Sequence, residues 1–304
     1  MTEAEFRALY ESVSNWGRWG KRSDRGALNY LTPERVARAT GLVRSGITVS
    51  LSKPLDTERR IDNPEPADHR MTMMPEGDGG SEGLHFAKDY IGADYHNEGH
   101  SHIDAFSHVA FDGVLYDGTP VSSVTADGAG SGAIDLLENG LVARGVLLDI
   151  PGVRGVPWLE PGDNVMPADV LEAEEQQGVL VEAGDVLLVR TGHVRRQFER
   201  GHWDTTKAKA GMHPTIARFL AERSVVALGS DGNNDTAPSA VDGIGFPIHV
   251  LTLNAMGVHL FDYLQLEDLL ARCEAAGRWE FLLAAAPLRI AGGTGSPLNP
   301  IAVF

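Results

Sequence analysis

The sequence predicts a single α/β domain, and three observations carry that prediction. Strands and helices alternate through the second half of the chain, between an apolar strand expected at 142–150 and a last one at 281–286. The 304 residues, of which 42% are hydrophobic and 22% charged, are enough for one large core. The sequence contains neither an internal repeat nor a stretch typical of an interdomain linker, so we expect one domain over 1–304.

Caps and hydrophobic periodicity locate the individual elements. Thr2 and Glu5 form the pattern of a capping box, and Thr32 before Pro33 is typical of a helix start. Gly277 is placed to end the last helix. We therefore expect helices at 2–14, from 32 onward, at 166–177, at 214–223 and at 266–276, and strands at 46–55, 142–150, 185–190, 225–229, 258–261 and 281–286.

One long stretch, 56–95, shows no periodicity and is rich in Pro, Gly, Met and acidic residues. A connection of that length in a compact domain is usually functional, so we expect a long loop at about 56–95. Residues 290–304 are predicted to be an extended tail.

The most informative stretch is 96–108, with the sequence HNEGHSHIDAFSH. It holds four of the chain's eleven histidines, together with Glu98 and Asp104. Glu98, His100, His102, Asp104 and His108 all stand at even positions, and alternate side chains of a strand share a face. One strand edge could therefore present several metal ligands at once.

Imidazole and carboxylate are the donors that zinc and manganese accept, and burying them without a partner would be costly. A solvated His-rich loop, or histidines bonded singly in a core, is the alternative. Bulky apolar residues within and just after the segment, such as Ile103 and Phe111, argue against a mobile surface loop. The stretch therefore predicts a divalent-metal site.

The bulk composition limits the class of partner. The net charge is −16 and the acidic residues are spread along the chain, so the surface should repel nucleic acid and anionic membranes. The single cysteine, Cys273, excludes an internal disulfide and a cysteine-based zinc site. Without an apolar run of about 18 residues or a signal-peptide pattern at the start, we expect a cytoplasmic protein.

The stretch at 98–108 resembles the signature H-x-G-T-H-x-D-x-P-x-H of the cyclase-like metal-dependent hydrolases. That family includes bacterial kynurenine formamidases, isatin hydrolases and some polyketide cyclases. His102, Asp104 and His108 match the signature directly. Further segments resemble the longer branch of the family, so the similarity spans nearly the whole chain: 19–33, 108–118, 184–192 and 286–297.

The resemblance implies a mixed β-sheet core with flanking helices, assembled as a homodimer or homotetramer. It implies that His102 and Asp104 bind metal, with Asp104 able to bridge two ions, and that His108 is the catalytic acid or base. The later ligands would be His249 and Asp262, where the family has a glutamate instead of Asp262. We expect Zn²⁺ first and Mn²⁺ as the alternative, as one ion or two.

The chain departs from the family at the start of the signature, where Glu98 stands at the usual first histidine and His100 replaces the glycine. Glu98 and His100 both stay open as metal ligands. His259 is a weaker choice, because its odd offset from Asp262 points it to the opposite face of a strand.

The resemblance implies hydrolysis of an amide, a cyclic amide or a lactone in a small, ring-containing substrate by metal-activated water. Trp19 and Phe106, which replaces the proline of the signature, are candidates for an apolar wall around that substrate. Ring closure or dehydration, as in the polyketide cyclases, is one alternative. A non-catalytic metal-binding or ligand-binding protein is the other.

Overall fold

The structure is a computed structural model that describes residues 1–20, 24–74 and 84–304. The predicted stretch 56–95 therefore lies partly outside the described residues. The α-helices are α1 (Glu3–Val13), α2 (Pro33–Thr40), α3 (Ile150–Arg154), α4 (Pro167–Gln177), α5 (His193–Arg200), α6 (Ile216–Arg223), α7 (Pro247–His249) and α8 (Glu267–Ala276). A π-helix, Val250–Met256, continues α7.

A nine-stranded mixed sheet forms the centre of the molecule, in the order β1-β15-β13-β7-β9-β11-β12-β4-β14. Strands β7, β9, β11 and β12 run parallel to their neighbours in that group, and the flanking pairs are antiparallel. The strands of this sheet are β1 (Thr48–Ser50), β4 (His102–Asp104), β7 (Leu141–Asp149), β9 (Val186–Arg190), β11 (Ala227–Ser230), β12 (His259–Asp262), β13 (Glu280–Ala285), β14 (Gly295–Pro297) and β15 (Ile301–Val303).

In the described ranges, three small two-stranded sheets accompany the central one. They pair β2 (Asp68–Met73) with β3 (Lys88–Gly92), β5 (Val124–Thr125) with β6 (Gly128–Ala129), and β8 (Asn164–Val165) with β10 (Gly211–Met212).

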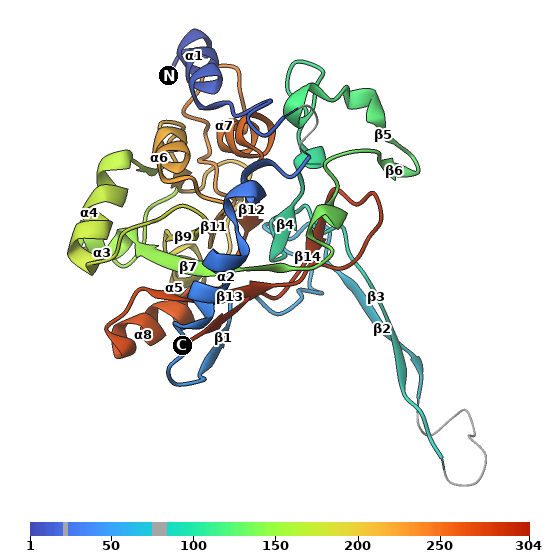
Figure 1. Cartoon of the computed structure of the whole chain (residues 1–304). Coiled ribbons are helices and arrows are strands. Elements are labelled where there is room, and N and C mark those ends of the chain that lie inside the picture. The colour runs from blue at the N-terminus through green and yellow to red at the C-terminus, as the bar shows by residue number, and fades with distance from the viewer. Residues whose placement is uncertain (21–23, 75–83) are drawn as a thin grey trace.

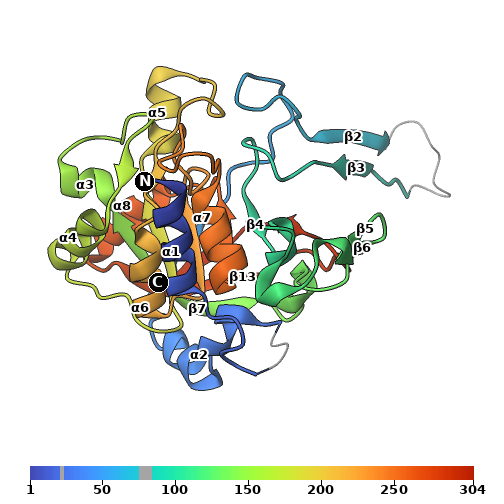
Figure 2. The ribbon, with the colours of Figure 1, turned by 90° about the horizontal axis from the view of Figure 1, so that it is seen from above.

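Helices cover both faces of the central sheet, which gives two apolar cores (Figures 1 and 2). Val146 and Leu148 of β7 face the core that contains residues of α1, α4 and α6. Leu147 of the same strand faces the second core, which contains residues of α8. Both faces of β7 are buried, so side chains at its even and at its odd positions are apolar. This explains its nearly continuous apolar sequence.

The structure confirms the predicted fold: one α/β domain with a mixed sheet and flanking helices. The capping box at Thr2 and Glu5 starts α1, and the Thr32 side chain caps α2. Gly277 ends α8 in the left-handed conformation. These local signals worked because each satisfies backbone groups that a helix end leaves open.

Several elements differ from the prediction. The strand expected at 46–55 is only three residues long, and α3 and α5 were not predicted. The strand expected in the histidine-rich stretch shrinks to His102–Asp104, and a 3₁₀ turn follows at Phe106–His108.

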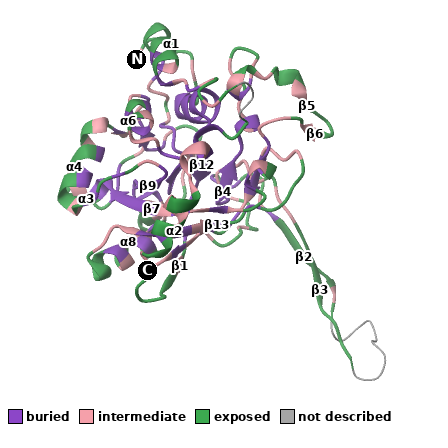
Figure 3. Cartoon of the chain, in the orientation of Figure 1, coloured by how far each residue is buried: buried purple, intermediate pink, exposed green. Residues whose placement is uncertain are grey.

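The stretch predicted as a loop contains an arm, formed by β2 and β3, that extends away from the body of the molecule (Figures 1 and 3). Nearly all of its strand residues are exposed. Within the described residues, no helix is long and apolar enough to cross a membrane.

Candidate metal centre

Strand pairing brings the first group of candidate ligands together. His102 of β4 lies opposite Asp262 of β12, and Asp104 lies opposite Leu260. Directly opposed residues of an antiparallel pair point to the same face, as do alternate residues of one strand. His102, Asp104 and Asp262 therefore share a face of the sheet.

The two oxygens of Asp104 face different histidines. Oδ1 lies 2.9 Å from Nδ1 of His96 and 3.6 Å from Nε2 of His102. Oδ2 lies 3.4 Å from Nε2 of His249. The Asp104 side chain is completely buried, and no hydrogen bond of normal geometry reaches either oxygen from the described residues.

His249 is the last residue of α7 and is held there by Asp235. The Asp235 carboxylate accepts the backbone N–H groups of Ile248 and His249, and also Nδ1–H of His249 at 2.6 Å. This bond directs the other ring nitrogen, Nε2, at Asp104 and at Asp262, each 3.4 Å away. A carboxylate behind a histidine is the usual way of orienting a metal-binding imidazole.

His102 is oriented in a similar way. Its Nδ1–H donates to the backbone carbonyl of His100 at 2.9 Å, and its Nε2 faces Asp104. On Asp262, the amide groups of Asn233 and Asn234 donate to one carboxylate oxygen each. These contacts hold the polar face of the sheet in one arrangement.

His96 comes from the irregular segment before β4. Its Nε2 lies 2.9 Å from Oγ1 of Thr294, and its ring stacks on that of His108 with centroids 3.9 Å apart. A side chain at Gly295 would collide with this ring, because its Cβ would lie 2.8 Å from Cε1 of His96. Glycine there gives the imidazole room beside Asp104.

Among residues 1–20, 24–74 and 84–304, two groups of three residues could each hold a metal ion, and Asp104 belongs to both. One group is His96, His102 and Asp104, and the other is Asp104, His108 and His249. Within each group, the ligand atoms all lie within 4.8 Å of one another. Buried carboxylate oxygens without hydrogen bonds, surrounded by ring nitrogens, fit a divalent cation well.

Charge in this cluster shifts the pKa of several groups. Burial raises the pKa of Asp104, but His108, His249 and His96 outweigh burial and hold that pKa well below its usual range. Burial also lowers the pKa of His249, yet the carboxylates of Asp104 and Asp235 bring it well above its usual value. Burial lowers the pKa of His108 to about 4.

The structure places the two open candidates, Glu98 and His100, outside these groups of three. Oε1 of Glu98 accepts a hydrogen bond from Nζ of Lys209 at 2.8 Å, so its charge already has a partner. His100 lines a separate apolar cavity beside Tyr95 and Leu298, and burial lowers its pKa. Among the described residues, His96 supplies the additional imidazole that faces Asp104, besides those of His102 and His249.

The two aromatic candidates also lie away from the cluster. Phe106 is buried, and its ring stacks on that of His259 with centroids 4.3 Å apart. Trp19 packs against Tyr30. Nδ1–H of His259 donates to the backbone carbonyl of Asp104, which is consistent with its placement on the opposite face of the strand.

A cavity of about 480 Å³ opens onto the cluster. Its polar lining includes His102, His108, His249 and Asp262. Its apolar wall is formed by Val109, Ala110, Phe111, Ile244, Phe246 and Val250. We call this space the metal cavity.

Sequence reasoning missed His96, Asp235 and Thr294 as site residues. Two of them carried a usable signal. His96 belongs to the dense histidine run, and Asp235 follows two asparagines a few residues after the buried strand β11. Thr294 carried none, because it reaches the site only through the pairing of β14 with β4.

Known proteins share both the sequence pattern and the fold of this chain. A family model described as "Putative cyclase" matches residues 49–234. A crystal structure described as a novel cyclase has a TM-score of 0.87 and 31% identity, and the alignment covers 96% of this chain and 99% of that one. No curated protein matches the chain in sequence.

More distant structures share the fold. Isatin hydrolase A from Labrenzia aggregata, bound to benzyl benzoate, has a TM-score of 0.60 and 21% identity, over 87% of this chain and 94% of that one. A structure described as a potential metal-dependent hydrolase with cyclase activity has a TM-score of 0.52 and 19% identity, over 84% and 96%.

Proposed function

Because the chain belongs to the putative cyclase family, we propose that it is a metal-dependent hydrolase that cleaves an amide, a cyclic amide or a lactone in a small, ring-containing molecule. The observation that supports this most strongly is Asp104. It is a buried carboxylate with no hydrogen bond of normal geometry from the part of the chain that the structure describes, and its two oxygens face two separate sets of imidazoles. Distant relatives of the same fold include isatin hydrolases and a potential metal-dependent hydrolase.

The proposed ligands are His102, Asp104 and His249, as the family resemblance implied, together with His96. We assign His96 the place of the missing first histidine of the signature, because its Nδ1 faces Asp104. Asp262 completes the set from β12. Zn²⁺ is the proposed ion, with Mn²⁺ as the alternative, and the Asp104 carboxylate has the geometry to serve one ion or two.

A bound divalent ion lowers the pKa of a water molecule from about 15.7 to near 7 and polarises a carbonyl group. His108 is the proposed acid or base. Its ring lies at the edge of the metal cavity with its centroid 6.2 Å from that of His249. Burial keeps the imidazole of His108 neutral near pH 7, so it can accept a proton and return it to the leaving group.

The substrate ring would contact the apolar wall of the metal cavity, above all Phe111 and Phe246. These residues take the role expected from the sequence for Trp19 and Phe106, whose rings are packed elsewhere. An arylformamide or a cyclic imide combines a flat ring with a hydrolysable carbonyl, so substrates of this kind suit a cavity with one polar and one apolar side.

The proposal is tested with a panel of arylformamides, cyclic imides and lactones. We expect hydrolysis of at least one class, loss of that activity after chelation, and recovery when Zn²⁺ or Mn²⁺ is returned. The family model and the similar structure described as a novel cyclase also support a second candidate, a cyclase or dehydratase. Metal-dependent ring closure of a polyketide-type substrate, without hydrolysis of any panel member, would favour that candidate.

A further inference from the structure

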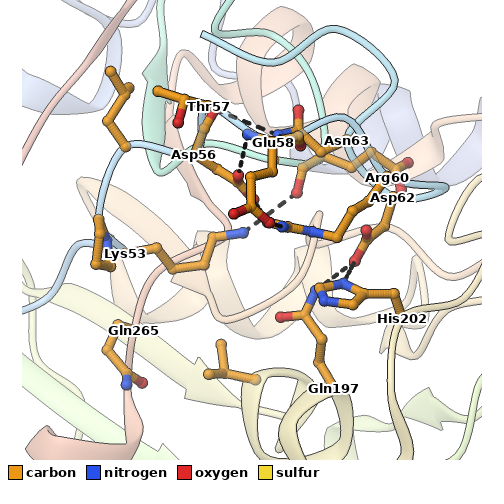
Figure 4. A pocket seen from close by; sticks show the side chains of 15 residues that line it. Lys53, Asp56, Thr57, Glu58, Arg60, Asp62, Asn63, Gln197, His202 and Gln265 are labelled. Carbon is orange, nitrogen blue, oxygen red and sulfur yellow. Dashed lines mark hydrogen bonds and ion pairs between the residues drawn. The ribbon is translucent and has the colours of Figure 1, made fainter. Parts of the chain in front are cut away.

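Glu98 lies on the wall between the metal cavity and a second cavity of about 470 Å³. In the second cavity, Arg60 forms ion pairs with both Asp56 and Glu58 (Figure 4). Two of the carboxylates on that side of the wall are therefore neutralised within the protein. On the other side, Glu98 shares the metal cavity with the candidate metal ligands.

Two lysines hold Glu98 in this position. Nζ of Lys209 donates to Oε1 of Glu98 at 2.8 Å, and Nζ of Lys53 donates to the backbone carbonyl of Glu98 at 3.3 Å. The side chains of Glu98 and Lys209 are only 16% and 3% exposed. Because Lys209 holds Oε1, the place of the other carboxylate oxygen, Oε2, is fixed as well.

That second oxygen of Glu98 is buried and receives no hydrogen bond of normal geometry from the described residues. The buried hydroxyl of Tyr263 lies close enough to interact with Glu98, but it also lacks such a bond within the described ranges. An unpaired carboxylate oxygen away from water costs free energy, and a donor on a bound molecule would offset that cost. Oε2 is therefore an open acceptor in the wall of the metal cavity.

Asn233 adds a second open acceptor to the same wall. Its Nδ2 donates to Oδ2 of Asp262 at 2.8 Å, which directs the amide, and its Oδ1 has no partner in the part of the chain that the structure describes. A further amide of this wall, that of Asn97, uses its Nδ2 on the backbone carbonyls of Glu65 and Asp94. The atoms that Glu98 and Asn233 leave open to a bound molecule are thus acceptors.

We propose that Glu98 determines substrate specificity by accepting a hydrogen bond from an N–H group of the substrate, with Asn233 as a second acceptor. This role depends on the proposed hydrolysis in the metal cavity and narrows its substrate class. An amide or a cyclic imide with a free N–H has a donor next to the carbonyl group that is cleaved, whereas a lactone has none. The preferred substrates are therefore N–H amides and imides.

A charged acceptor makes such discrimination strong. A hydrogen bond to an ionised carboxylate is about twice as strong as one between neutral groups. A substrate without the N–H group would leave Oε2 buried and unpaired, and a site rejects such an analogue far more than one that loses only an apolar contact. The signature of this role is a selectivity ratio, which a purely structural ion pair would not control.

The test compares phthalimide with N-methylphthalimide, which differ only at the ring nitrogen. The measured quantity is the ratio of kcat/KM for the N–H imide to kcat/KM for the N-methyl imide. Glu98→Gln keeps the shape of the side chain. Because Lys209 requires the amide oxygen as its acceptor, the amide NH₂ group takes the place of Oε2, and an acceptor becomes a donor.

Two further variants complete the design. Glu98→Leu combined with Lys209→Met removes the acceptor without leaving a buried ammonium group unpaired, in case the single substitution prevents folding. Glu199→Gln changes a carboxylate in an exposed ion pair with Arg195 and is the control. Circular dichroism and elemental analysis show whether each variant is folded and keeps its metal.

We expect the ratio to fall at least about tenfold in Glu98→Gln and in the double variant, and to stay within about threefold of wild type in Glu199→Gln. The metal content should equal that of wild type in every variant. An unchanged ratio in both Glu98 variants would overturn the proposal. Loss of metal from folded Glu98→Gln would also overturn it, because Glu98 would then be a metal ligand.

The substrate panel separates this proposal from the proposed function. Hydrolysis of lactones but of no N–H compound would overturn the role of Glu98 and leave the hydrolase standing. If arylformamides are hydrolysed and imides are not, formanilide and N-methylformanilide replace the two imides in the comparison.

If no compound is hydrolysed, the proposed hydrolysis fails, and calorimetric titration with the two imides tests recognition alone. The N-methyl imide should then bind wild type more weakly than the N–H imide, and this difference should shrink at least about tenfold in the Glu98 variants. The same difference in wild type and variants, or no binding of either imide up to about 10 mM, would overturn the proposal.

Discussion

At Asp104, two carboxylate oxygens in a fully buried position face imidazoles from three different segments of the chain. Neighbouring residues fix each imidazole by contacting the ring nitrogen that points away from Asp104. Asp235 holds His249, the His100 carbonyl holds His102, and Thr294 holds His96. A cluster whose ligands are already oriented loses little conformational entropy when a cation enters, because few rotamers remain to be fixed.

The histidine run offers a matched test at the residue scale. We expect His96→Ala to weaken metal binding by at least about tenfold, because it removes the Nδ1 that faces Asp104. His100→Ala should leave metal binding unchanged, because that ring lines a different cavity. Competition with a chelator of known affinity measures both effects.

The opposite ranking, with His100→Ala losing metal and His96→Ala retaining it, would show that the assignment of the extra imidazole is mistaken. Unchanged thermal unfolding of both variants is the control.

The sequence could place His102 and Asp104 together by strand alternation and by the family signature, and the family resemblance alone added Asp262 to them. It could not choose among Glu98, His100 and His96. The segment before β4 is irregular, so its side chains do not alternate, and the even-number rule fails outside His102–Asp104. Glu98 in fact turns to Lys209, which lies more than a hundred positions later in the chain.

At the scale of elements, β4 gains its position from its two neighbours. It is only three residues long, but it is hydrogen-bonded between β12 and β14. All three of its residues are buried. The short strand is therefore a rigid support for His102 and Asp104, and its alternation puts both side chains on one face.

Elements with a strong local signal were predictable, and those defined by tertiary pairing were not. Helix α1 has its capping box, and β7 has a long apolar run. The π-helix at Val250–Met256 has no distinctive sequence signal, because its widened turn depends on the packing around it. Short strands such as β14 exist only because β4 lies beside them.

The turn before β9 gives a stability prediction. Burial raises the pKa of Asp185 to about 6, and Arg144, with Nη1 3.6 Å away, only partly offsets this. Between about pH 4 and pH 6 the folded state therefore binds more protons at this carboxyl than the unfolded state does. Its contribution to stability is present at low pH and is lost as the pH rises, by about 3 kcal/mol in total.

We expect the difference in unfolding free energy between wild type and Asp185→Asn to shift in favour of the variant between about pH 4 and pH 7, by about 2–3 kcal/mol. Urea unfolding of both proteins at the two pH values measures it. A difference that does not change with pH would show that Asp185 titrates normally in the folded protein.

At the scale of the whole molecule, the arm formed by β2 and β3 is the part least able to stay folded through its own contacts. A two-stranded ribbon is marginal in water by itself, and this one exposes Met71, Tyr90 and Ile91. Exposed apolar side chains on a projecting ribbon are typical of a surface that contacts another chain. The arm therefore supports the expectation of a homodimer or homotetramer.

We expect light scattering to give two or four times the chain mass of 32.7 kDa. The double substitution Met71→Asp and Ile91→Asp should shift that mass toward the single chain, because it places charge on the proposed contact. The matched control is Leu171→Asp, which places a charge at an exposed apolar position on α4. A wild-type protein that remains a single chain at high concentration would contradict this expectation.

Everything proposed for the metal cavity rests on a divalent ion held around Asp104. The most direct test is elemental analysis of the purified protein and of Asp104→Asn, which keeps the shape of the side chain and removes its charge. We expect about one or two Zn²⁺ or Mn²⁺ ions per wild-type chain and a large loss of metal in the variant. Wild-type protein that purifies without metal and takes up none on addition, or a variant with the same metal content as wild type, would contradict the proposed metal centre.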